Sequence, residues 1–274
     1  MNGFCVLLSL MVCLDDQGAP ATAPASTAVS AAPAIDPRIE AILNEMESTG
    51  ANVEAIRCKV RYIVDSQINI GDRSERDGEV IYQTARPHPR FLITFMREKQ
   101  GMGDEAIILP EKVWYLLQDR RLAIAKEQSK TVQRVQVAKP GEEVDFFDIN
   151  KAPFPFPFGQ KKRPMLEQFD ITLVKPAKDE QHVDHLVCIP KPGAPVGDQW
   201  EKLDYYVLKD LRLPQRIVAV EKAGDKVITT IFPDLSSESL KAKLTDKDFE
   251  PPGDWQGYDT VVEGLDGAPL DAAK

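Results

Sequence analysis

The fold of this chain is decided by residues 56–70, which read IRCKVRYIVDSQINI. The even positions of this stretch are mostly apolar, whereas most odd positions, such as Arg57 and Asp65, are polar. Such alternation has the two-residue period of a β-strand with one dry and one wet face. The sequence therefore predicts one long strand here. Its residues expected on the core side are Ile56, Val60, Tyr62, Val64 and Ile68.

Further strand-like runs follow at short spacing, separated by turn residues such as those at 77–78 and 110–111. They cover 79–85, 90–99, 105–109, 113–117, 122–126 and 131–137, and, after a break at 139–164, 171–174, 183–189, 203–208, 215–221 and 226–232. A short helical turn is expected near 165–169. Because no helices of regular length alternate with these strands, the pattern favours an antiparallel meander over a parallel doubly wound sheet.

One clear helix precedes the strands. Asp36 is a good N-cap and Pro37 suits the first helical position, while Gly50 is expected to end the helix. The apolar residues fall on one stripe, as expected for a helix that packs on a core. They are Ile35, Ile39, Ile42, Leu43 and Met46.

The N-terminal region has the pattern of an export signal. The apolar run Phe4–Leu14 is about half of the ~20 residues that a membrane-spanning helix needs, and small residues follow it at 19–23. We expect a secretory signal at 1–23, a linker rich in Ala, Pro, Ser and Thr at 24–34, and a periplasmic protein. Leu10 and Cys13 match a lipobox, but Val12 stands where a small residue is preferred. Lipidation of Cys13, with the signal ending at residue 12, therefore stays open beside free release.

Composition and motifs exclude several classes of function. The chain has 274 residues, a net charge of −9 and a pI near 5.0, and it lacks the basic patch of a nucleic-acid-binding protein. It has no nucleophile elbow, zinc-protease motif or phosphate-binding loop. His182, His185 and Cys188 have metal-like spacing, but in a strand His185 faces away from the other two. We expect no enzymatic activity, cofactor or metal site.

Two cysteines remain after the N-terminal region, Cys58 and Cys188. In an oxidising compartment they could form a disulfide, provided that their Cα atoms approach within ~4.4–6.8 Å. Two separately buried thiols on strands are the alternative. The sequence leaves both open.

The order of motifs resembles the periplasmic lipoprotein carrier family, the LolA-like proteins. The match consists of the helix, the long strand, Gly78 and Tyr82 before Arg86-Pro87, then Val113-Trp114-Tyr115, the turn and strand at 210–217, and the residues at 249–253. It spans about 36–255. The resemblance implies a mainly β fold: an incompletely closed antiparallel β-barrel of eleven strands, a half-barrel whose apolar side is covered by short helices. We accordingly expect one lipid-binding domain at 35–255 and a polar tail at 256–274.

The resemblance also implies a function. The protein would be a monomeric, non-enzymatic carrier that binds acyl chains of lipoproteins or lipids, takes them from an inner-membrane transporter and passes them to an outer-membrane acceptor. Arg86 would hold the lid closed until lipid displaces it. The residues expected to line the lipid site with Arg86 are Ile39, Leu43, Met46, Tyr62, Val64, Phe91, Ile93 and Trp114. Two alternatives remain, a membrane-tethered LolB-like acceptor and a ligand-sensing or interaction module without a transfer role.

Overall fold

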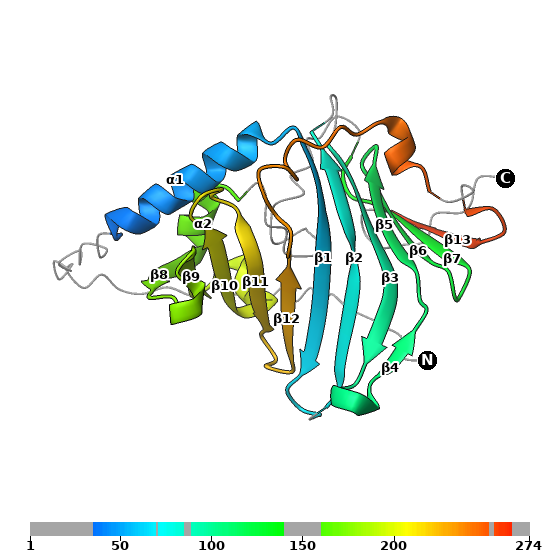
Figure 1. The fold of residues 1–274 in the computed structure, drawn as a ribbon, viewed down its shortest axis with the longest axis horizontal. Coiled ribbons are helices and arrows are strands. Elements are labelled where there is room, and N and C mark those ends of the chain that lie inside the picture. Colours follow the sequence, from blue (N-terminus) through cyan, green and yellow to red (C-terminus); the bar gives the residue numbers. More distant parts are fainter. Residues whose placement is uncertain (1–34, 70, 85–88, 140–159, 252–254, 265–274) are drawn as a thin grey trace, which may run out of the picture. The chain divides into compact units, whose positions relative to one another are not determined.

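The computed structural model describes residues 35–264, except 70, 85–88, 140–159 and 252–254. In this part of the chain, strands form one sheet and two α-helices lie against it (Figure 1). The helices are α1 (Pro37–Asn52) and α2 (Lys162–Gln168). The strands are β1 (Ala55–Ser66), β2 (Arg73–Gln83), β3 (Arg90–Gln100), β4 (Ile107–Leu109), β5 (Val113–Gln118), β6 (Arg121–Lys126), β7 (Thr131–Gln136), β8 (Phe169–Val174), β9 (Val183–Pro190), β10 (Trp200–Leu208), β11 (Pro214–Glu221), β12 (Lys226–Ile231) and β13 (Asp259–Glu263).

The strand order is β13-β7-β6-β5-β3-β2-β1-β12-β11-β10-β9-β8, with β4 paired to the far end of β3. The sheet does not close into a barrel, because β13 and β8 remain its two edges. Among the described residues there are thirteen strands, not the eleven expected. All pairs are antiparallel except β13 with β7. The expected polar tail therefore contains an edge strand that the sequence pattern did not reveal.

Strand β1 lies in the middle of the sheet, between β2 and β12. Ile56 and Val60 are buried and Tyr62 and Val64 partly buried, which confirms the predicted face for these four residues. Ile68 is a correction. Since β1 ends at Ser66 and the chain turns, the Ile68 side chain is 68% exposed.

Helix α1 begins as predicted, with the Asp36 carboxylate accepting a hydrogen bond from the Arg38 backbone N–H at 2.9 Å. It continues past Gly50 to Asn52, so the glycine does not end it. Its buried side chains are Ile39, Ile42, Leu43 and Met46, whereas Ile35 is 44% exposed. The predicted stripe is thus confirmed apart from its first member.

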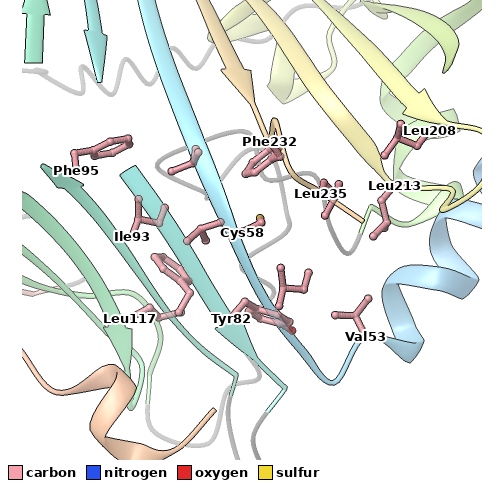
Figure 2. Close-up of a cluster of buried hydrophobic side chains, with 14 of the residues drawn as sticks. Val53, Cys58, Tyr82, Ile93, Phe95, Leu117, Leu208, Leu213, Phe232 and Leu235 are labelled. Carbon is pink, nitrogen blue, oxygen red and sulfur yellow. The ribbon is translucent and has the colours of Figure 1, made fainter. Parts of the chain in front are cut away.

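The sheet buries apolar side chains on both faces. We call the face that carries the even-numbered residues of β1 the helix face, because its β8–β12 half packs against α1 and α2. On the same face, a second cluster continues over β1, β2, β3, β5 and β6; Figure 2 shows Cys58, Tyr82, Ile93, Phe95 and Leu117 within it. The opposite face of β2–β7 packs against the C-terminal segment, through Phe249 and Trp255.

Gly78 explains how β2 and β3 fit together. The pairing of these strands shifts between Asp77 and Gly78, which is a β-bulge. A Cβ atom at Gly78 would lie 2.1 Å from the Thr94 carbonyl oxygen. Only glycine allows the two backbones to approach so closely here.

Polar contacts fix the C-terminal segment on the opposite face. The Arg90 guanidinium lies 4.1 Å from the centre of the Phe249 ring and 2.8 Å from an Asp246 oxygen. Arg57 also forms an ion pair with Asp248. Within residues 35–264, as far as they are described, no helix is long and apolar enough to cross a membrane.

Candidate functional site

The α1-covered half of the helix face holds Ile39, Leu43, Met46 and Val64, which are four of the predicted site residues. Ile39, Leu43 and Met46 pack in one cluster with buried residues of β8–β12, such as Tyr205. Val64 is partly buried against the same cluster. These residues therefore lie together, as the sequence predicted.

This half of the face also contains buried polar atoms. The Tyr205 hydroxyl, the Thr230 hydroxyl and the Trp200 indole N–H have no hydrogen-bond partner among the described residues. Tyr205 and Thr230 are each paired with Ile217 on β11, so they stand in one row across the sheet. Burial, together with the nearby Cys188, raises the pKa of Tyr205 far above its ordinary value, which keeps the hydroxyl neutral.

A row of three aromatic rings joins the two halves of the helix face. Tyr62 contacts both apolar clusters, and its ring centre lies 6.1 Å from that of Phe95. Phe95 meets Tyr115 edge-on, again at 6.1 Å. We call Tyr62, Phe95 and Tyr115 the aromatic row. Such geometry is favourable for ring pairs, and the three rings together make a continuous apolar layer between the two clusters.

An ion pair borders the aromatic row. Arg76 is paired with Tyr62 on β1 and with Glu98 on β3, so its side chain is on the helix face. Its Nε and Nη2 atoms donate to Glu98 Oε2 at 2.9 and 2.7 Å, and Gln100 donates to the other Glu98 oxygen at 3.1 Å. The Glu98 side chain is only 6% exposed, which makes this a largely desolvated pair.

The pair and the rings perturb one another's protonation. Burial would raise the pKa of Glu98, but the hydrogen bonds and charge of Arg76 outweigh it and lower that pKa. Burial raises the pKa of Tyr62 to about 12, helped by Tyr115. Burial also raises the pKa of Tyr115, although Arg76 acts against it. At neutral pH the site therefore holds two neutral phenols beside one compensated charge pair.

The remaining predicted lining residues divide between the two faces. Phe91 and Ile93 are buried on the helix face, in the cluster that contains Phe95. Trp114 is a correction, because it is buried on the opposite face with Phe249 and Trp255. Neighbouring residues of a strand point to opposite faces, so Tyr115 occupies the helix face in its place.

The two cysteines are free and buried. Cys58 is on β1 and Cys188 on β9, and β12, β11 and β10 lie between these strands. Four strand spacings of ~4.8 Å separate them by about 19 Å, far beyond disulfide reach. The separate thiols are therefore the correct alternative, and the disulfide is excluded in this fold.

Two predicted residues lie outside the described part of the chain, namely Arg86 and Cys13. Sequence reasoning, for its part, missed Arg76 and Glu98. The polar run at 73–77 hides the strand period, and Glu98 falls near the end of the expected strand 90–99, where a charged residue is ordinary. Such a pair can be recognised only when the register of the two strands is known, because only then do the arginine and the glutamate fall at facing positions.

The fold and its apolar face define a class: a mainly β protein with one incompletely closed sheet and helices over one face. No family model matches the chain, and no curated protein matches it. Solved structures with a similar fold include a LolA superfamily protein from Nitrosomonas europaea, with 11% identity, a TM-score of 0.36, and coverage of 77% of this chain and 97% of that one.

Two further structures are similar in fold. A conserved protein from Thermus thermophilus has 13% identity and a TM-score of 0.42, and the match covers 82% of this chain and 99% of that one. Pseudomonas aeruginosa MucB, solved in complex with MucA, has 11% identity and a TM-score of 0.42. That match covers 79% of this chain but 62% of the other, so this chain spans less than two thirds of the MucB match.

Proposed function

We propose that this protein is a non-enzymatic periplasmic carrier, which binds acyl chains of lipoproteins or other lipids reversibly and moves them toward the outer membrane. One observation carries the proposal. The apolar helix face extends beyond the half that α1 covers, and the aromatic row joins both halves into one surface. A surface of this kind suits a long apolar chain better than a small polar substrate.

The energetics allow transport without an external energy source. An acyl chain of about fourteen methylenes gains roughly 11 kcal/mol on transfer from water, at ~0.8 kcal/mol per CH₂. Val60 and Phe95 are already buried, so an acyl chain reaches them only if the covering part of the protein moves. That rearrangement and the ordering of the lipid offset part of the gain, which makes release feasible.

The charged groups would set the limits of the site. Arg76 and Glu98 compensate each other beside the aromatic row, so an acyl chain would pass along the rings rather than separate the pair. Arg86 remains our proposed gate, since its acceptors would have to be released when lipid enters. An inner-membrane donor and an outer-membrane acceptor are the partners that such a carrier requires.

Binding of a fluorescent fatty acid to the purified protein tests the proposal, with lipid mass spectrometry of the protein as isolated. Tyr62→Gln should weaken binding by about 10-fold, because it places an amide on the apolar face. Tyr258→Gln is the matched control, since Tyr258 is a half-buried tyrosine that packs on the opposite face. A lipid-free protein that binds no acyl probe would overturn the proposal and favour an interaction module.

A further inference from the structure

A cavity on the opposite face of the sheet is separate from the proposed acyl site. It has a volume of about 370 Å³, within the range of small-molecule pockets. Leu116, Ala123 and Trp255 form its apolar walls, while Arg121 and Arg134 reach it from neighbouring strands. A second cavity of about 280 Å³ adjoins it and shares the same two arginines.

The two arginines converge by register. Arg134 on β7 is paired with Ala123 on β6, and Arg121 is two residues from Ala123 on the same face. Diagonal neighbours of this kind are ~7–8 Å apart, which long side chains span easily. Two guanidinium groups that reach the same cavity can bind one carboxylate or phosphate group from two sides.

Two donors on residues that line this cavity have no hydrogen-bond partner within the described part of the chain. In the described part of the chain, neither Arg121 nor Arg134 forms an ion pair, although most other arginines there do. The Arg134 Nε atom is buried without a hydrogen-bond partner, and so is the indole N–H of Trp255. Buried donors normally have partners, so two unpartnered donors on residues that line one cavity, beside two arginines without an ion pair, point to a ligand.

We infer that this cavity binds a small organic anion, one carboxylate or phosphate group on an apolar body. The arginines would hold the anionic group, and Trp255 would pack against the body. Asp119 also lines the cavity, and its negative charge disfavours ligands with several charges. Glu263 borders the adjoining cavity, but its Oε1 atom accepts a hydrogen bond from the Gln133 side-chain amide at 2.9 Å. The site is independent of the acyl-binding proposal.

Nuclear magnetic resonance of the indole N–H groups in the full chain tests the inference. The chain has three tryptophans, and Trp255→Phe identifies the resonance of Trp255. Titration with benzoate or phenyl phosphate should shift that resonance and yield a dissociation constant. Inorganic phosphate should bind more weakly because it lacks the apolar body. Equal binding of inorganic phosphate would overturn the assignment of an apolar ligand.

Variants distinguish specific anion binding in this cavity from non-specific attraction of anions to surface arginines. Arg134→Gln and Arg121→Gln should each weaken benzoate binding by about 10- to 100-fold. Arg134→Lys keeps the positive charge but loses the planar, two-pronged set of guanidinium donors, so it should weaken benzoate binding less. Arg97→Gln is the matched control, because it removes the same charge from an exposed position on β3 and should change affinity less than about twofold. Equal effects of Arg97→Gln and Arg134→Gln, or no shift at tens of millimolar benzoate and phenyl phosphate, would overturn the inference.

Discussion

Arg76 and Glu98 form the most enclosed arginine–carboxylate pair on the helix face, with Nη2 and Oε2 2.7 Å apart beside Tyr62. The next residues of the same two strands, Asp77 and Arg97, form an exposed pair at 3.4 Å. These two ion pairs between the same strands differ in desolvation and in geometry, because Asp77 lies closer to Arg61, at 2.8 Å, than to Arg97. The exposed pair of Asp77 and Arg97 can therefore serve as a reference when the coupling energy of the buried pair is measured.

The first prediction is a double-mutant cycle on these pairs. Arg76→Leu or Glu98→Leu should each lower the free energy of unfolding by about 2–4 kcal/mol, because each leaves a desolvated charge alone. The double variant should cost less than the sum, with a coupling of about 1–3 kcal/mol. The same cycle on Asp77 and Arg97 should give less than about 1 kcal/mol. Urea unfolding measures both, and equal coupling in the two cycles would contradict the desolvation argument.

The second prediction concerns pH. The pKa of Glu98 is lower in the folded protein than in the unfolded chain, where it is about 4.3. The carboxylate therefore stabilises the fold above that unfolded value, and this contribution is lost as the pH falls through the lower folded pKa.

Glu98→Gln should be less stable than the parent at pH 7, and the difference should shrink as the pH approaches 2.5. Asp77 and Asp248 also have lowered pKa values, but they titrate in both proteins and cancel in the comparison. Thermal unfolding across this pH range measures the difference. A gap that stays constant with pH would show that Glu98 has the same pKa in the folded and unfolded states.

Much of the fold could be predicted because the buried side of each helix or strand shows in the spacing of its own apolar residues. In β1 the alternation of polar and apolar residues identified the face that carries Ile56 and Val60. In α1 the stripe from Ile39 to Met46 identified the buried side. Each prediction needed only the period of its own element.

The remaining features depend on partners that the local pattern does not encode. Trp114 and Tyr115 are both apolar, and the C-terminal segment decides which face buries Trp114. Arg76 joins the site through its register with Tyr62. Likewise, the strand order alone shows that Cys58 and Cys188 are far apart.

The third prediction concerns these thiols. Burial, followed by the charges of Asp234 and Glu79, raises the pKa of Cys58 to about 12, and burial raises that of Cys188 as well. Almost no thiolate is present at pH 8, so a disulfide reagent should react very slowly with the native protein. In a Cys5→Ser/Cys13→Ser variant, two thiols should react at once in denaturant. Fewer than two would indicate a disulfide and contradict the strand order.

The same thiols report on opening of the helix face. Cys58 lies in the cluster with Phe95, whereas Cys188 lies under α1. If acyl chains occupy the half that contains the aromatic row, a bound fatty acid should slow the labelling of Cys58 more than that of Cys188. Mass spectrometry of labelled peptides measures the two rates, and equal slowing would show only a general stabilisation of the fold.

The last prediction tests the proposed gate at Arg86. If its guanidinium holds the closed state, lipid must break those hydrogen bonds on entry, and their return assists release. Arg86→Leu removes the acceptor contacts and adds apolar surface, so both changes favour the loaded state. At ~1–3 kcal/mol for a hydrogen-bonded charge, the variant should bind a fatty acid about 5- to 150-fold more tightly. It should also transfer the lipid to an acceptor membrane more slowly.

Arg97→Leu makes the same change at an exposed strand position and should leave both properties unaltered. Weaker binding by Arg86→Leu, or transfer at the parent rate, would remove Arg86 from the mechanism and leave the aromatic row as the part of the site on which binding depends.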